Sequence, residues 1–150
     1  MKKIDTLVTL PLSEEVIQHI ETMKSVMVKN NWMYITGKDA RYFLMGDPYT
    51  PDNIITCINP MIVDHSVDMS SEIVETCNDH KGIVLSPKRF NWIRVRYTAI
   101  NGNTDTIKFS GLTSVLFQHC MDHLNGIPFY SKVSTMQLDI AKRKAAKNKS

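Results

Sequence analysis

The sequence contains no apolar run that approaches the roughly 20 residues needed to span a bilayer. Its first residues, MKKIDTLVTLPLSEE, also lack the apolar core of a signal peptide ahead of the acidic pair. It has only three cysteines, and this odd number outside a short secreted chain argues against a disulfide framework; they are Cys57, Cys77 and Cys120. We therefore expect a cytoplasmic protein with no membrane role, whose thiols are core residues or ligands.

Two residue types used in catalysis are missing over long stretches. No glutamate follows Glu75, and no glutamine occurs between Gln18 and Gln118. A reaction that requires a glutamate base or a glutamine donor from those stretches is therefore excluded.

Composition and charge are otherwise ordinary. The chain is 43% apolar and 22% charged over 150 residues, which suits one packed domain spanning residues 1–150. The net charge of +3 is uneven, because residues 141–150 hold five Lys or Arg and no acid. Such a basic end is typical of a solvated tail, and it also suits a polyanion such as ribosomal RNA. We predict a basic C-terminal helix or tail at 133–150 with the ribosome as a possible partner, and expect no DNA binding.

Helical periodicity occurs at both ends of the chain. Between Pro11 and Lys29, apolar residues recur at spacings of three and four, and Ser13 is placed as an N-cap. A second helix is predicted from Leu112 to Leu124, ended by Asn-Gly and Pro, and a short third over residues 133–146.

The middle of the chain is predicted to form strands. The predicted strands are 41–45, 54–58, two stretches within 72–86, 92–100 and 105–111. An Asn-Pro pair is expected to end the strand at 54–58, and an Asn-Gly turn joins the strands at 92–100 and 105–111. This order predicts an α+β domain in which antiparallel sheets pack around a central helix.

The string QHCMDHLNG on the second predicted helix is the most informative feature for chemistry. His119 and His123 are four residues apart, so their imidazoles share one helical face, as a tetrahedral or five-coordinate metal requires. Such a pair is also common as two packed or solvated histidines. A metal site needs a third ligand, for which the candidates are Cys77, His80 and Cys57.

These motifs resemble the peptide deformylase family, whose third motif is H-E-x-D-H-L and whose second is E-G-C-L-S. The chain has HCMDHL at 119–124 and ETCND at 75–79, and the interval between Cys77 and His119 matches the family spacing without a gap. The Pro-Lys-Arg segment, the Asn-Gly turn, the string INP at 58–60 and the lysine-rich end extend the resemblance over most of the chain.

The resemblance implies a metal site of Cys77, His119 and His123, with the fourth position open to water or a formyl oxygen. One divalent transition metal such as Fe2+, Zn2+, Ni2+ or Co2+ suits a thiolate with two imidazoles. Asp122 then either orients a ligand or its helix, or is an exposed or capping carboxylate. Glu75 would hold the loop that carries the thiolate.

Two catalytic groups of the family are absent. Cys120 stands at the position of the family's glutamate base, and a shorter thiol with an ordinary pKa of about 8.5 is a poor replacement. Residues 30–37 (NNWMYITG) replace the glycine-rich first motif together with its oxyanion-binding glutamine. The backbone N–H of Asn78 could still donate to an oxyanion. We expect the pocket to be partly filled by three bulky residues, Trp32, Met33 and Tyr34.

The rate losses expected from the two missing groups favour an impaired enzyme. Losing a general base typically lowers the rate ~10²–10⁴-fold and losing one oxyanion donor ~10²–10³-fold, and since such groups act as a unit we expect a deficit of at least about 10³. The sequence thus predicts a metalloprotein that acts at or near N-formyl-methionyl nascent chains on the ribosome with little or no deformylase activity. One alternative is an active deformylase whose base is Asp122, His80 or Cys120. Another is a vestigial or purely structural metal site in which Cys120 fills or perturbs the fourth position.

Overall fold

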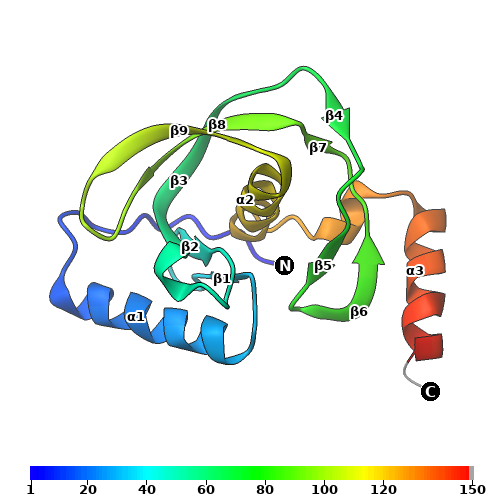
Figure 1. The fold of residues 1–150 in the computed structure, drawn as a ribbon, viewed down its shortest axis with the longest axis horizontal. Helices are drawn as coiled ribbons and strands as arrows, with labels where there is room; N and C mark the ends of the chain where they lie inside the picture. Colours follow the sequence, from blue (N-terminus) through cyan, green and yellow to red (C-terminus); the bar gives the residue numbers. More distant parts are fainter. Residues whose placement is uncertain (149–150) are drawn as a thin grey trace.

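The computed structural model describes residues 1–148, in which antiparallel strands surround helix α2 (Gly111–Leu124) (Figure 1). The main sheet has the order β1-β2-β3-β8-β9, and all its neighbouring strands are antiparallel. Its strands are β1 (Tyr34–Thr36), β2 (Tyr42–Met45), β3 (Ile55–His65), β8 (Trp92–Thr98) and β9 (Thr104–Ser110). The predicted α+β class, with sheets packed around a central helix, is confirmed.

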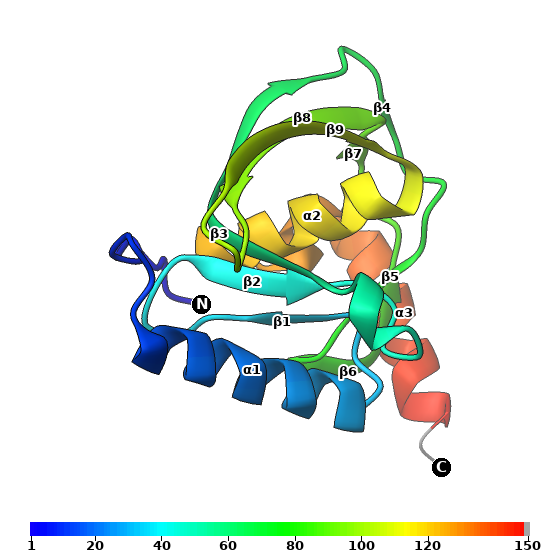
Figure 2. The ribbon, with the colours of Figure 1, turned by 60° about the vertical axis from the view of Figure 1, so that its left-hand side comes forward.

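Helix α1 (Glu14–Lys29) begins where the cap predicts. The Ser13 side chain accepts a hydrogen bond from the Val16 N–H, and two glutamates occupy the first turn. The apolar face of the helix packs on β2, burying Met27 completely. Helix α1 therefore covers the side of β1 and β2 that faces away from α2 (Figure 2).

Strand β2 is buried on both faces because it lies between two helices. Tyr42 and Leu44 belong to the cluster beneath α1, whereas Phe43 and Met45 belong to the cluster around α2. This alternation is the period of two expected of a strand. The same rule holds in β8, where three buried residues alternate with exposed arginines: Ile93, Val95 and Tyr97.

Strand β3 corrects one prediction, because it does not end at Asn59-Pro60. Asn59 has φ of 51°, and its side chain pairs with both backbone groups of Val8 at 2.8 and 3.0 Å. The register shifts between Ile58 and Met61, so a bulge accommodates the proline, which has no N–H to donate. Beyond the bulge the strand continues to His65 in pairing with β8.

Two small strand pairs and a last helix complete the fold. Strands β5 (Glu75–Cys77) and β6 (His80–Leu85) form one antiparallel pair, and β4 (Met69–Ser70) and β7 (Arg89–Phe90) form the other. Short 3-10 turns cover Pro51–Asn53 and Phe129–Lys132.

Helix α3 (Thr135–Asn148) packs against β6, starting two residues later than the sequence predicts. The last two residues of the predicted basic tail, 149 and 150, lie outside the described residues. Within the described part of the chain, no helix combines the length and the apolar character that crossing a membrane requires.

Candidate metal centre

Helix α2 and strand β5 bring three potential metal ligands together. The Cys77 Sγ, the His119 Nε2 and the His123 Nε2 lie within 4.8 Å of one another, and all three residues are buried. The Sγ of Cys77 is 3.3 Å from the Nε2 of His123, which is 3.2 Å from the Nε2 of His119. A tetrahedral ion with bonds of about 2.0–2.3 Å separates its ligand atoms by roughly 3.3–3.7 Å. The donor set and its spacing therefore fit a divalent transition metal.

The local sequence explains this convergence. One helical turn of α2 places both imidazoles on the same face. Strand β5 ends at Cys77, which pairs with His80 at the start of β6 after a shift in register. The cysteine packs in a small cluster with Phe129 and Ala141, which fixes the strand end beside α2.

A buried carboxylate holds the far nitrogen of His119, and an exposed one lies near that of His123. The Nδ1 of His119 lies 2.8 Å from an oxygen of Glu75, and the Nδ1 of His123 lies 3.7 Å from an oxygen of Asp79. Since a carboxylate only accepts, Glu75 holds the Nδ1 proton of His119, so the neutral ring would present its Nε2 lone pair to a metal. Glu75 thus orients a potential ligand in addition to holding its strand. The sequence did not single out Asp79 of the ETCND string, whose exposed carboxylate lies too far from His123 for a direct hydrogen bond.

A buried ionic network extends from Glu75 to the other side of α2. Arg89 donates to both oxygens of Glu75, at 2.8 and 2.9 Å, and to Asp122 through its other terminal nitrogen. Asp122 is buried and also pairs with Lys132 at 3.4 Å, so it is not an exposed carboxylate. Burial opposes ionisation of Glu75, but Arg89 and His119 outweigh it and lower the pKa of that carboxyl.

The three thiols differ in their ionisation. Burial disfavours the Cys77 thiolate, but hydrogen bonds from His119, His123 and Tyr34 outweigh burial and lower the pKa of that thiol to about 5. A thiolate, the form that binds metals, is therefore present at neutral pH. Burial raises the pKa of Cys57 and Cys120, which lie in the core at 0% exposure.

The other ligand candidates lie elsewhere. His80 packs its ring against Phe129 and Tyr130, with centroids 6.0 and 5.0 Å apart. Cys57 is a core residue of β3, as the sequence suggests. Among residues 1–148, the cluster that could hold a metal contains neither of these residues, nor Cys120.

Tyr34 is the one bulky residue of the 30–37 segment that reaches the ligands. Its hydroxyl oxygen lies 3.3 Å from the Cys77 Sγ and accepts a 3.0 Å hydrogen bond from the backbone N–H of Asn78. The predicted oxyanion donor therefore faces a side chain of the protein itself. The expectation for the other two residues is wrong: Trp32 packs in the α1 cluster, and Met33 is exposed.

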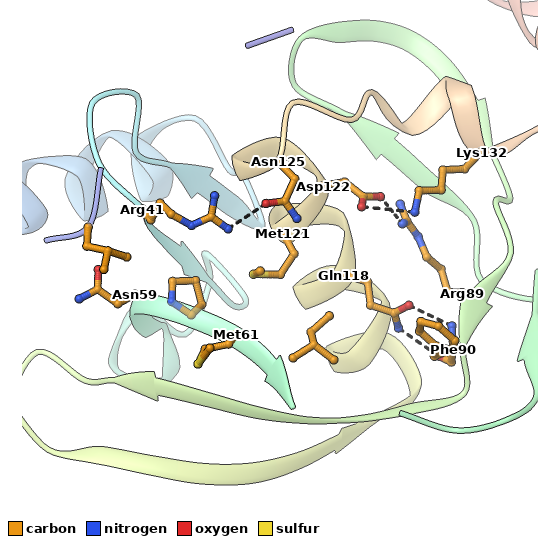
Figure 3. A pocket seen from close by; sticks show the side chains of 13 residues that line it. Arg41, Asn59, Met61, Arg89, Phe90, Gln118, Met121, Asp122, Asn125 and Lys132 are labelled. Atoms are coloured by element: carbon orange, nitrogen blue, oxygen red, sulfur yellow. Dashed lines mark hydrogen bonds and ion pairs between the residues drawn. The ribbon is translucent and has the colours of Figure 1, made fainter. Parts of the chain in front are cut away.

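A separate cavity of about 590 Å³ lies along a neighbouring face of α2 (Figure 3). The helix lines it with Gln118, Met121, Asp122 and Asn125, whereas neither histidine of the cluster contributes. Its charged groups are already engaged, since Arg41 bonds Asn125 and Asp122 bonds Lys132. This cavity is therefore distinct from the candidate metal centre.

The chain is similar in sequence and in fold to known peptide deformylases. A family model described as polypeptide deformylase matches residues 1–139. "Peptide deformylase 2" of Geobacillus stearothermophilus is 37% identical over 81 residues, covering 51% of this chain and 42% of the relative. A peptide deformylase from Synechococcus elongatus, solved in complex with actinonin, has a TM-score of 0.82 at 25% identity, covering 94% of this chain and 78% of that chain.

A peptide deformylase from Plasmodium falciparum has a TM-score of 0.85 at 22% identity, covering 97% of this chain and 88% of that chain, and this likeness shows the fold. The chain spans about two fifths, 42%, of the length of the first curated relatives it matches. The family resemblance indicated by the motifs is confirmed by these findings.

Proposed function

Because the chain belongs to the polypeptide deformylase family, we propose that it is a metal-binding member with little or no deformylase activity. Cys77, His119 and His123 would hold one divalent ion such as Fe2+, Zn2+ or Ni2+. When bound, the metal would supply Lewis-acid polarisation of an oxygen ligand. The observation that carries the proposal is Cys120, a core thiol at 0% exposure at the position where the motif resemblance expects the family's base.

Hydrolysis of a formyl group needs a base that accepts a proton from the attacking water and passes it to the leaving amine. Cys120 is fully buried, and burial raises the pKa of its thiol, so it stays protonated and shielded from water. The nearest carboxylates, Glu75 and Asp79, face the Nδ1 sides of the imidazoles, away from the three ligand atoms. None of these three side chains is placed to act as the base.

The two other substitute bases are also engaged elsewhere. Asp122 is paired with Arg89 and Lys132 in the buried network, which fixes the direction of its carboxylate. His80 is packed between aromatic rings outside the ligand cluster. These contacts support low turnover over an active deformylase with a rearranged base.

We expect the purified, metal-quantified protein to hydrolyse a formyl-methionyl peptide at least about 10³-fold more slowly than a deformylase that has the family glutamate. The assay measures kcat/KM for both proteins under the same conditions, loaded with the same metal. A typical enzymatic rate would contradict the proposal and favour the active deformylase that the names of the relatives suggest.

We further propose that this member works in the cytoplasm at the ribosome, near N-formyl-methionyl nascent chains. Helix α3 supports this, because Lys142, Arg143 and Lys144 are exposed while Ala141 and Ala145 hold the helix against the domain. Cations on an exposed helix face attract RNA by releasing its counterions.

Neutralising the exposed α3 cations (Lys142→Gln, Arg143→Gln, Lys144→Gln) is expected to weaken ribosome co-sedimentation and flatten its salt dependence. Each lost phosphate contact lowers the slope of log affinity against log salt by roughly 0.7–0.9. A matched variant loses the same charge from exposed lysines outside α3: Lys29→Gln, Lys38→Gln, Lys88→Gln. Equal loss of binding in both variants would mean that net charge, not α3, is responsible.

A further inference from the structure

We propose that the phenol oxygen of Tyr34 is the fourth ligand of the metal, closing the position that the family resemblance leaves open. The inference rests on the proposed metal site and adds one residue to it. It makes the ion a coordinatively saturated, structural centre.

The geometry of four atoms carries this inference. The Tyr34 hydroxyl oxygen lies 3.3 Å from the Cys77 Sγ, 3.3 Å from the His119 Nε2 and 3.4 Å from the His123 Nε2. Among the three ligand atoms, the Nε2 of His123 lies 3.2 Å from the Nε2 of His119 and 3.3 Å from the Sγ of Cys77. The oxygen therefore lies nearly equidistant from all three ligand atoms. These spacings are close to the roughly 3.3–3.7 Å that separate the ligand atoms of one tetrahedral ion.

The surroundings hold the oxygen at this corner. Tyr34 is 6% exposed, and its ring lies against the imidazoles of His119 and His123, with centroids 5.0 and 5.4 Å apart. Asn78 fixes the tyrosine at both ends, since its N–H donates to the hydroxyl oxygen and its side-chain amide donates to the Tyr34 carbonyl at 3.3 Å. The ring cannot leave the centre without breaking these contacts.

The Tyr34 hydroxyl donates to the Cys77 Sγ at 3.3 Å, an ordinary length for a bond to the large sulfur atom. The same oxygen also lies within 3.4 Å of both imidazole Nε2 atoms, so it faces all three ligand atoms and not one of them alone. The Asn78 N–H also points at the oxygen as it would at an oxyanion. As a ligand, the phenol would lose its proton to solvent, and this N–H would help to stabilise the phenolate.

The test uses the full chain loaded with Co(II), whose visible spectrum reports coordination number, and azide as the competing ligand. The Tyr34→Phe variant removes only the oxygen; Tyr97→Phe, at another buried tyrosine on strand β8, is the matched control. We expect the wild type and Tyr97→Phe to show intense four-coordinate bands that azide does not change. Tyr34→Phe should bind Co(II) at least about tenfold more weakly and change its spectrum as azide enters the vacated position.

A second measurement keeps the test valid if Tyr34→Phe does not fold. Adding Zn(II) to the metal-free wild type should produce the ultraviolet difference band of one ionised tyrosine per bound metal. Two results would overturn the Tyr34 assignment and leave the three-ligand metal site standing. One is azide entry into the wild type at the concentration that saturates Tyr34→Phe, and the other is zinc binding without the tyrosinate band. Failure to bind Co(II) or Zn(II) stoichiometrically would instead overturn the proposed metal site itself.

Discussion

Replacing Cys77 with Ser is expected to lower the metal content from about one divalent ion per chain to below roughly a tenth, because the thiolate is the strongest donor in the set. The thiol already has a pKa of about 5, so it binds a metal at neutral pH without the cost of removing a proton. A serine hydroxyl has nearly the same shape but stays protonated and neutral. Elemental analysis of dialysed protein measures the loss.

The control for this prediction is His80→Ala, because His80 follows Cys77 closely and is the rival ligand suggested by the sequence. Its ring packs on Phe129 and Tyr130 outside the cluster, so this variant should keep its metal. Chelation should also lower the melting temperature of the wild type and of His80→Ala, since metal binding favours the folded state. Full metal content in Cys77→Ser together with loss in His80→Ala would show that the ligand assignment is wrong.

Local sequence rules predict most of the framework. Helix α1 follows from its cap and its apolar spacing, and the β8–β9 hairpin follows from alternation around Asn-Gly, where Gly102 adopts φ of 89°. The pairing of β2 with β3 follows from two short apolar runs on either side of a turn-rich segment. In each case a feature within a few residues determines the structure.

The exceptions depend on contacts between distant residues. Strand β3 passes through Pro60 because the side chain of Asn59 bonds Val8, 51 residues earlier in the chain. No local pattern carries that information, and an Asn-Pro pair on its own favours a strand end. The sequence likewise does not predict strand β1, because its three residues depend on pairing with β2 and on packing against α2.

The candidate site divides in the same way. The histidine spacing and the family motifs pointed to Cys77, His119 and His123, which the fold then brings together. Tyr34 precedes Cys77 by 43 residues, and only the folded structure shows that its hydroxyl lies against the three ligand atoms. Arg89 entered the sequence analysis only within the Pro-Lys-Arg segment, because a lone arginine gives no signal that it will be buried between two carboxylates.

Arg89→Met is expected to destabilise the fold by about 3–5 kcal/mol, the usual cost of breaking a buried ion pair from one side. Arg89 is 3% exposed and pairs with Glu75 and Asp122, so its loss leaves two carboxylates buried without their main partner. Methionine keeps much of the unbranched stem, which limits the effect of lost packing. Denaturant unfolding measures the difference, and Arg94→Met, on an exposed face of β8, should stay within about 0.5 kcal/mol of the wild type.

The same variant tests whether the network reaches the metal centre. Glu75 would be free to turn from the Nδ1 of His119, so metal affinity should fall ~10–100-fold, as when other outer partners of a ligand are lost. Adding Glu75→Gln and Asp122→Asn to Arg89→Met removes the two buried charges that lost Arg89 and should recover most of the stability. The weakened metal affinity should persist, because an amide accepts less strongly from His119 than a carboxylate does. If the triple variant stays as unstable as Arg89→Met, the cost lies in packing around the arginine and not in buried charge.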